Sequence, residues 1–200
     1  FALAFVRQLG AMVPAEMPLP RLPIDPAARE RVVGRIACEL GADGLVPQRY
    51  DEDTKVMFRE RRRVTMRFEP DHVVLADGRE RERPPGVQDS ASQFVQLAWM
   101  FTLRPELLRS GNTVELALAL PRNVDRWVFD VLGEETLYTP FGAVAAFHLK
   151  PRRSSRPGGD LSAEIWFAPQ LRYFPVRILI RQDGDKFVDL MISKRPEMAG

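Results

Sequence analysis

The sequence has a single cysteine, Cys38, and only two histidines, His72 and His148. One cysteine excludes an intramolecular disulfide, and Cys38 lies in an apolar run where a buried, unreactive thiol is expected. Neither histidine belongs to an H-x-x-x-H or H-E-x-x-H pattern, so no metal site is predicted. His148 alternates with strand residues and lies beside Lys150, which predicts a partly exposed strand position.

Long apolar runs and nucleotide-binding or nucleophile motifs are also missing. No run approaches the roughly 20 apolar residues that span a bilayer, so no membrane span is predicted. The chain has no G-x-S-x-G elbow, no G-x-G-x-x-G and no P-loop. We therefore predict a non-enzymatic protein with no catalytic residue and no cofactor.

An excess of charge of either sign is missing too. The chain carries 29 basic and 27 acidic side chains, a net charge of +2. This balance provides no field that would steer a polyanion toward the protein, so nucleic acid is not the expected partner. The run RERRRVTMRF places Arg61, Arg63 and Arg67 on one strand face, where guanidinium groups suit phosphate. Acidic residues lie nearby at 51–53, and a solvated outer face is the better interpretation.

What is present is an ordinary globular composition. The chain has 200 residues, 45% hydrophobic and 28% charged, which suffices for one domain with a real core. Prolines between Pro14 and Pro26 exclude a regular helix or central strand there. Residues 1–31 are therefore predicted to be an N-terminal segment with a proline-rich connector, and residues 32–200 a single β-rich domain. The start without methionine is typical of a truncated or processed chain.

Period-two alternation of apolar and polar residues dominates from residue 61 onward. It predicts strands at 61–68, 72–76, 113–120, 126–131, 143–149, 161–168, 176–181 and 187–193. Asp77-Gly78 and Asp183-Gly184 are hairpin turn signals, and hairpins of this kind form antiparallel sheets. Glu134 and Glu135 follow Gly133 and are interpreted as part of a tight reversal between two strands, not as an acid/base pair.

One segment has the helical period instead. Ser90 followed by Gln93 is a capping-box pattern, and apolar residues from Ala91 to Phe101 then share one face. The predicted helix covers about residues 90–103 and ends before Pro105. The fold class is therefore mainly β: a strongly curved antiparallel sheet or partly closed β-barrel with one main helix packed against or inside it.

The chain resembles the domain-of-unknown-function family numbered 3108 from about Val32 to Ser193. The matching pieces are VVGRIACELGADGLVPQRY, QFVQLAWMF, DRWVFDVLGEETLYTPFGAVAAFHLKP and EIWFAPQLRYFPVRILIRQDGDKFVDLMIS. The resemblance implies an exported protein of the periplasm or cell envelope of a Gram-negative bacterium, similar in kind to the outer-membrane lipoprotein carriers. Those carriers hold acyl chains between a curved sheet and a helix. No catalytic residues are established for the family, so none is carried over.

Aromatic residues on the candidate inner face are the main candidate site. A groove for a lipid, acyl chain or hydrophobic peptide is predicted to be lined by Trp127, Phe129, Phe147, Phe167, Phe94 and Phe101. Core packing explains these residues equally well. The alternative is a scaffolding partner of envelope machinery, bound through a sheet edge or through Pro14 to Pro26. A hydrolase is a third, weaker hypothesis.

The stretch WFAPQLRYFPVRI supplies the one candidate polar contact, Arg177. A strand to Ala168, a turn opened by Pro169 and a new strand after Pro175 are predicted, with Tyr173 and Phe174 filling the corner. Arg177 is interpreted as a structural clamp if it pairs with Glu164 or Asp189, and as a groove residue if it faces an empty space.

Overall fold

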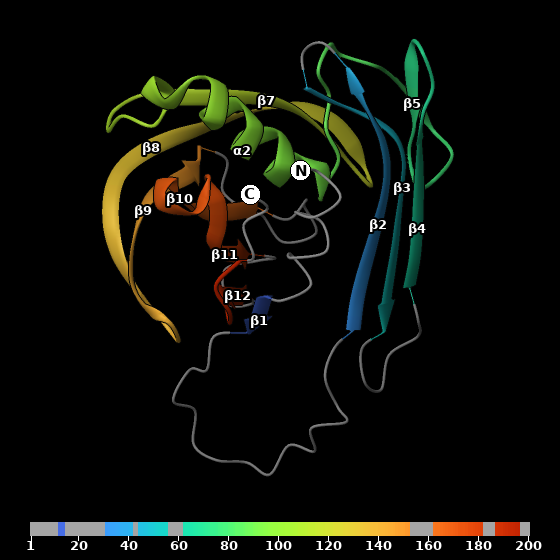
Figure 1. Ribbon diagram of the computed structural model, residues 1–200. Coiled ribbons are helices and arrows are strands. Elements are labelled where there is room, and N and C mark those ends of the chain that lie inside the picture. Colours follow the sequence, from blue (N-terminus) through green and yellow to red (C-terminus); the bar gives the residue numbers. More distant parts are fainter. Residues whose placement is uncertain are drawn as a thin grey trace. The chain divides into compact units, whose positions relative to one another are not determined.

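The computed structural model describes residues 12–14, 31–41, 44–55, 62–152, 162–181 and 187–196. The described part of the chain is mainly β, with strands that form two antiparallel sheets, and it contains one α-helix (Figure 1). Packing divides the chain into a larger unit, residues 1–15, 93–116 and 126–200, and a smaller unit, residues 16–92 and 117–125. Strands β7 (Thr113–Leu120) and β8 (Asn123–Thr139) each supply residues to both units. The single domain at 32–200 therefore stays a prediction.

The larger sheet has seven strands in the order β1-β12-β11-β10-β9-β8-β7. Its strands are β1 (Met12–Pro14), β7 (Thr113–Leu120), β8 (Asn123–Thr139), β9 (Gly142–Pro151), β10 (Ser162–Ala168), β11 (Phe174–Arg181) and β12 (Phe187–Ile192). The predicted strands from residue 113 onward are therefore confirmed, and β11 and β12 pair antiparallel as expected. The turn at Asp183-Gly184 lies outside the described residues.

The smaller sheet has five strands in the order β2-β3-β4-β5-β6. They are β2 (Arg31–Gly41), β3 (Gly44–Lys55), β4 (Arg62–Phe68), β5 (His72–Val74) and β6 (Glu80–Glu82). Gly78 has a φ of 82° and its N–H donates to the Leu75 carbonyl, so the predicted Asp77-Gly78 turn is present. Within the described residues both strand orders run from one edge to another, so a partly closed barrel stays a prediction. The expected burial of the Cys38 thiol concerns a side chain outside the described ones.

The long strand β8 corrects one prediction. Gly133 and the two glutamates after it do not reverse the chain, because β8 continues through them to Thr139. Leu132 is an extra residue in the β8–β9 ladder, and Gly133 takes a φ of 141° there. A bulge needs the same permissive backbone as a turn, which is why the glycine signal was misread. The reversal lies at 140–141 instead.

Helix α2 (Ser92–Leu103) lies against the seven-stranded sheet (Figure 1). The Phe101 ring meets the Phe167 ring of β10 edge-on, with 5.1 Å between centroids, and the Tyr173 ring lies 6.2 Å from it. Phe101 and Phe167 are fully buried. Each such ring contributes about 2 to 3 kcal/mol by burial, so this contact fixes the helix on the sheet.

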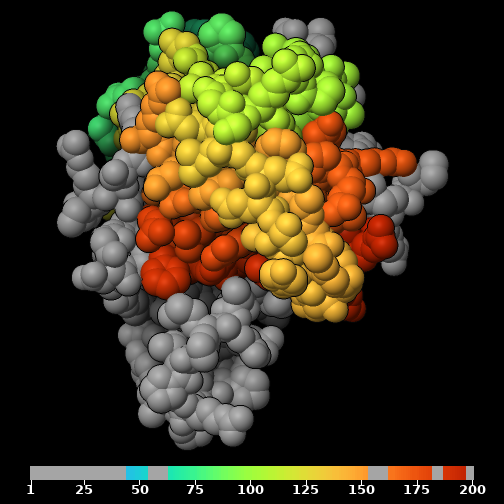
Figure 2. All heavy atoms as spheres, turned by 90° about the vertical axis from the view of Figure 1, so that its left-hand side faces the viewer, coloured from blue at the N-terminus to red at the C-terminus, as the bar shows by residue number. Residues whose placement is uncertain are grey.

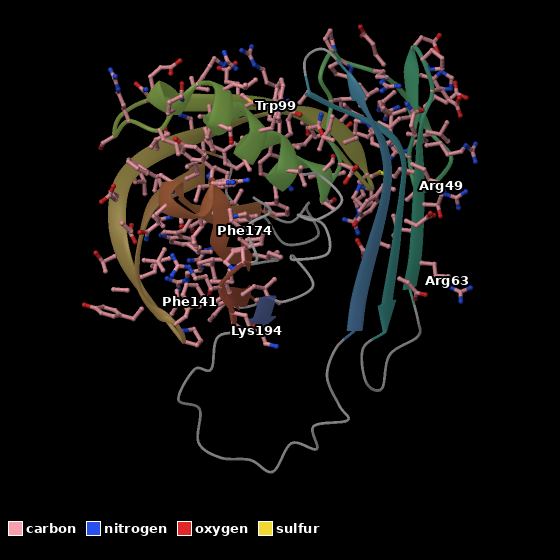
Figure 3. The ribbon with its side chains drawn as sticks, in the orientation of Figure 1. Arg49, Arg63, Trp99, Phe141, Phe174 and Lys194 are labelled. Carbon is pink, nitrogen blue, oxygen red and sulfur yellow. The ribbon has the colours of Figure 1, made fainter. Side chains whose placement is uncertain are left out.

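The corner between β10 and β11 is built as predicted. The 3-10 turn η3 (Pro169–Leu171) follows β10, and the next two residues, Arg172 and Tyr173, both have positive φ, 51° and 56°. Residues with side chains occupy this region at a cost of roughly 1 kcal/mol or more each, so the corner is strained. Phe174 is buried behind it (Figure 3).

The smaller unit has its own core. Alternate residues of β4, namely Val64, Met66 and Phe68, are buried, whereas Arg63 and Arg67 are exposed, as the alternation predicts. The buried cluster consists of Tyr50, Val64, Met66, Phe68, Val73, Leu75, Val87 and Ala119. This apolar face organises the five-stranded sheet.

The start of α2 is capped one residue earlier than predicted. The Asp89 carboxylate accepts hydrogen bonds from the N–H groups of Ala91 (2.7 Å) and Ser92 (2.9 Å), and the Asp89 N–H donates to Ser92 Oγ. The reciprocal box therefore joins Asp89 to Ser92. Asp89 is fully buried, and this burial raises the pKa of its carboxyl group.

The Asp89 pKa makes a pH-dependent prediction. Folding raises the pKa of this carboxyl group, so the folded state favours its protonated form. The resulting stabilisation is fully present below the unfolded pKa of about 3.9 and is lost as pH rises through the folded pKa. Asp89→Asn keeps the cap without the charge, so its free energy of unfolding should rise relative to wild type from pH 4 to pH 7. Urea unfolding at both pH values measures this.

Asp89→Ala is the control. It removes both the cap and the carboxyl group, so it should be about 0.5 to 2 kcal/mol less stable than Asp89→Asn at both pH values. Parallel pH profiles for wild type and Asp89→Asn would contradict the raised pKa.

Candidate functional site

The strongest group of polar side chains lies across the seven-stranded sheet. His148 of β9, Trp166 of β10 and Arg177 of β11 are direct cross-strand neighbours. They form one row because side chains opposite each other in antiparallel strands share a face. Leu149, Ile165 and Ile178 form the neighbouring row, which points to the opposite face. Figure 2 shows β8 and β9, yellow to orange, at the surface of this unit.

His148 lies between two carboxylates. Its Nδ1 is 3.0 Å from Glu135 Oε1, and its Nε2 is 2.9 Å from Glu164 Oε2. The histidine side chain is only 10% exposed and that of Glu164 11%, whereas that of Glu135 is 47% exposed. The strand position predicted for His148 is confirmed, but its predicted partial exposure is wrong, because the residue is buried between polar partners.

Trp166 holds the centre of the row. Its indole N–H donates to Glu135 Oε2 at 3.0 Å, so Glu135 joins the tryptophan to the histidine. The His148 and Trp166 rings stack with centroids 4.0 Å apart and planes 15° from parallel. The Arg177 guanidinium lies 4.7 Å from the Trp166 ring centroid, within the range of a cation–π contact.

Arg177 is a clamp, the first of its two interpretations. Its Nε donates to Asp189 Oδ1 at 2.9 Å and its Nη2 to Asp189 Oδ2 at 2.6 Å, a bidentate pair between β11 and β12. The hydrogen bond to Asp189 raises the pKa of Arg177. Arg181 Nε lies 3.2 Å from Glu164 Oε1 and ties β11 back to β10.

This row, which we call the ionic row, consists of Glu135, His148, Glu164, Trp166, Arg177, Arg181 and Asp189 and joins β8 to β12. Its polar groups pair with one another across neighbouring strands and so connect β8 to β12. No group of three or more histidine, cysteine or acidic side chains suited to a metal ion occurs among the described residues. None of the described helices is long and apolar enough to cross a membrane.

The six predicted groove residues lie on the other face of the sheet and on α2. Cross-strand pairing joins Phe167 to Phe147, and the Trp127 and Phe129 rings stack 6.3 Å apart. Because Phe167 contacts Phe101 of α2, this is the helix-facing side. Phe147 is half-buried, and the other five residues, Trp127, Phe129, Phe167, Phe94 and Phe101, are buried. We call this group the aromatic interior.

The basic strand of the smaller unit presents a charged outer face. Arg49 of β3 and Arg63 of β4 project outward (Figure 3). Arg63 lies 3.6 Å from Asp53, and Arg67 lies 3.7 Å from Glu69. Arg49 pairs with Asp51 at 2.7 Å. These alternating charges fit the predicted solvated face; Arg61 lies outside the described residues.

The smaller unit also has a surface pocket of about 260 Å³, lined in part by Leu45, Pro47, Pro84 and Val87. Arg83 borders it, but its guanidinium donates to the carbonyls of Phe68, Glu69 and Pro47. Those bonds commit the guanidinium to the backbone, so we assign no ligand to this pocket.

Sequence reasoning missed Glu135 and Trp166 and misplaced His148. The usable signal was the E-x-W spacing of Glu164 and Trp166, which places an acid and an indole on one strand face. Their partners, His148 and Glu135, are 16 and 31 residues distant in sequence. Only the strand register brings them together.

In the part of the chain that the structure describes, the protein is mainly β, with helix α2 on a seven-stranded antiparallel sheet. The chain belongs to the family described as Protein of unknown function (DUF3108), whose model matches residues 27–190. The resemblance seen in the sequence is thereby confirmed. Comparison with the curated proteins and with the solved structures gave no significant match.

Arg177→Met tests the clamp. It leaves the Asp189 carboxylate, whose side chain is 14% exposed, without its bidentate partner. We expect a loss of about 2 to 4 kcal/mol in the free energy of unfolding, measured in urea. The double variant Arg177→Met/Asp189→Leu should recover more than half of it, because no charge is then left unpaired. A single variant as stable as wild type would contradict the clamp.

The two histidines form a matched pair for a second prediction. His148→Phe keeps a ring against Trp166 but removes both contacts to carboxylates, and should cost about 1 to 3 kcal/mol. His72→Phe, at a side chain 32% exposed beside Asp71, should change stability by less than about 0.5 kcal/mol. Urea unfolding compares them, and equal losses would show that His148 is not held by the row.

Proposed function

We propose that this chain is a non-enzymatic protein of the bacterial cell envelope that binds a hydrophobic ligand between α2 and the helix-facing side of the seven-stranded sheet. The observation that supports the proposal most is the aromatic interior, in which Phe101 of the helix meets Phe167 of the sheet. Aromatic and aliphatic surface of this kind suits an acyl chain, because such ligands are held by apolar contact.

In the structure this interior is filled by its own side chains, since Phe101, Phe129 and Phe167 are almost inaccessible to solvent. A ligand would therefore enter by displacing side chains. The corner of η3 is the weakest part of this boundary, because Arg172 and Tyr173 hold positive φ while the Tyr173 ring lies against Phe101. Releasing the corner relieves strain, which lowers the cost of opening.

The outer side of α2 offers a path for an apolar molecule. Trp99 (Figure 3) and Met100 are half-buried. Leu103 at the end of the helix is 59% exposed. Exposed apolar residues near a buried apolar interior support the entry of a ligand from a lipid environment or a partner.

A strongly curved sheet is part of the same proposal. Two irregularities support it: the extra Leu132 in β8, and a register shift between Trp166 and Phe167 in the β10–β11 pair. Bulges bend the strand and increase its twist, so two of them favour a sheet that wraps around α2. The location in the envelope rests on the resemblance to exported bacterial proteins, and fractionation of producing cells tests it.

Uptake of the fluorescent apolar probe N-phenyl-1-naphthylamine tests the ligand proposal. Tyr173→Gly keeps the left-handed backbone but removes the ring from Phe101, so we expect faster uptake in stopped-flow measurements. Arg172→Gly is the matched control: it makes the same backbone change at an exposed side chain and keeps the Tyr173 ring, so its uptake should be no faster than that of wild type.

Saturating ligand should also stabilise the protein, by about 2.7 kcal/mol at 100 times the dissociation constant. Native mass spectrometry of the purified protein identifies a co-purified lipid. No probe uptake by any of the three proteins, together with no bound lipid, would refute the proposal.

A further inference from the structure

The hairpin of β8 and β9 extends past the neighbouring strand β10 in the seven-stranded sheet. Strand β9 pairs with β10 as far as Phe147, which lies opposite Phe167. The β8–β9 ladder continues for five more residue pairs, from Ala146 to Gly142 along β9. At about 3.4 Å per residue this is about 17 Å of strand, so the turn at 140–141 forms a tip that projects beyond β10 (Figure 1).

The backbone of this tip is held in one shape by its own residues. Thr139 Oγ1 donates to the Gly142 carbonyl at 2.7 Å and accepts the N–H of Phe141 at 3.3 Å. Gly142 has a φ of 116°, which glycine adopts at little cost, and the ring of Pro140 restricts the turn further. The tip therefore needs little ordering before it contacts another surface.

The tip is uncharged and carries two aromatic residues. Residues 137–143 read LYTPFGA. Tyr138 is 82% exposed, more than any other large hydrophobic residue of the described part, and Pro140 is exposed beside the half-buried Phe141. A tyrosine combines an apolar ring with a polar hydroxyl group, so it suits the boundary between water and lipid. The exposed Tyr138 ring at a projecting, uncharged tip is therefore suited to a lipid headgroup layer.

Two exposed basic residues, Lys194 and Arg195, lie at the same end of the sheet. They follow β12, which runs in the same direction as β8 because the four pairings from β8 to β12 are all antiparallel. Figure 3 shows Phe141 and Lys194 at the lower end of this unit. The described residues of this end, 136–146 and 192–196, include no aspartate or glutamate. Among the residues that the structure describes, neither Lys194 nor Arg195 makes an ion pair. This end therefore suits an anionic surface.

We propose that this end of the sheet docks on the surface of an anionic lipid bilayer: the Tyr138 ring enters the headgroup layer, and Lys194 and Arg195 contact lipid phosphates. Each basic residue near an anionic bilayer contributes about fivefold in affinity. One ring or a few charges alone bind a bilayer weakly, so the two signals act together and the docking is reversible.

The shape of this end favours lipid as the partner. A fluid headgroup layer closes around a projecting tip, whereas a folded protein needs a matching hollow to reach the same complementarity. The docking end is separate from the aromatic interior, and its role does not depend on the ligand proposal.

Co-sedimentation of the full chain with vesicles tests the role of charge. Phosphatidylcholine vesicles that contain phosphatidylglycerol at about 30 mol% should bind the chain at least about fivefold more tightly than phosphatidylcholine alone. Sodium chloride at about 0.5 M should remove most of this difference. Lys194→Glu should weaken binding to the anionic vesicles at least about fivefold.

Lys150→Glu is the matched control. It makes the same change of charge at an exposed residue of β9. Lys150 lies about 27 Å of strand from the tip, which is more than a Debye length, so this variant should change binding less than about twofold.

A fluorescent label locates the contact with lipid. In a Cys38→Ser background, Tyr138→Cys carrying a nitrobenzoxadiazole dye should brighten and shift to shorter wavelength on anionic vesicles, because the dye responds to an apolar environment. The same dye on Lys150→Cys should not change. Residue 138 is exposed, so its substitution should leave the fold intact, which circular dichroism checks.

Three outcomes would overturn the proposal. No binding of anionic vesicles by the unaltered chain would mean that this end does not dock on lipid. Equal binding by Lys194→Glu and Lys150→Glu would place the charge contact elsewhere. A dye at residue 138 that stays unchanged while heparin releases the chain from the vesicles would assign the basic residues to a soluble polyanion instead of a bilayer.

Discussion

The register of β9, β10 and β11 is the constraint on which the rest of the larger unit depends. It sets His148, Trp166 and Arg177 in one row and Leu149, Ile165 and Ile178 in the next. Because strand side chains alternate between faces, a slip of one residue would move the charged groups toward α2 and the apolar groups outward. The ionic row and the aromatic interior are therefore two results of one pairing.

The two faces of the seven-stranded sheet have different roles. Buried ion pairs in general add little net stability, because desolvation offsets the Coulomb attraction, but they penalise arrangements that leave one partner alone. The ionic row thus specifies how β8 to β12 align. The helix-facing side carries the apolar contacts, and Arg172 and Tyr173 hold positive φ at the corner beside it.

Local patterns in the sequence predicted the helix and the strands from residue 113 onward, but not β2, β3 or β6. The Asp77-Gly78 turn, the helix near 90–103 and the corner from Ala168 to Phe174 follow from short-range preferences that tertiary contacts do not oppose. Gly133 was misread because a bulge and a turn both need its backbone freedom. The cap moved to Asp89 because Asp and Ser are both good caps, and local sequence does not choose between neighbours.

The sequence by itself determined the mainly β class, the strand faces, the helix and the family, because each follows from residue periodicity or from motifs in order along the chain. Only the tertiary structure decided that His148 is buried between Glu135 and Glu164. It also decided that Arg177 pairs with Asp189 and that β1 pairs with β12. These contacts join residues far apart in the chain. Their partners are set by strand order and register, which alternation along a single strand does not encode.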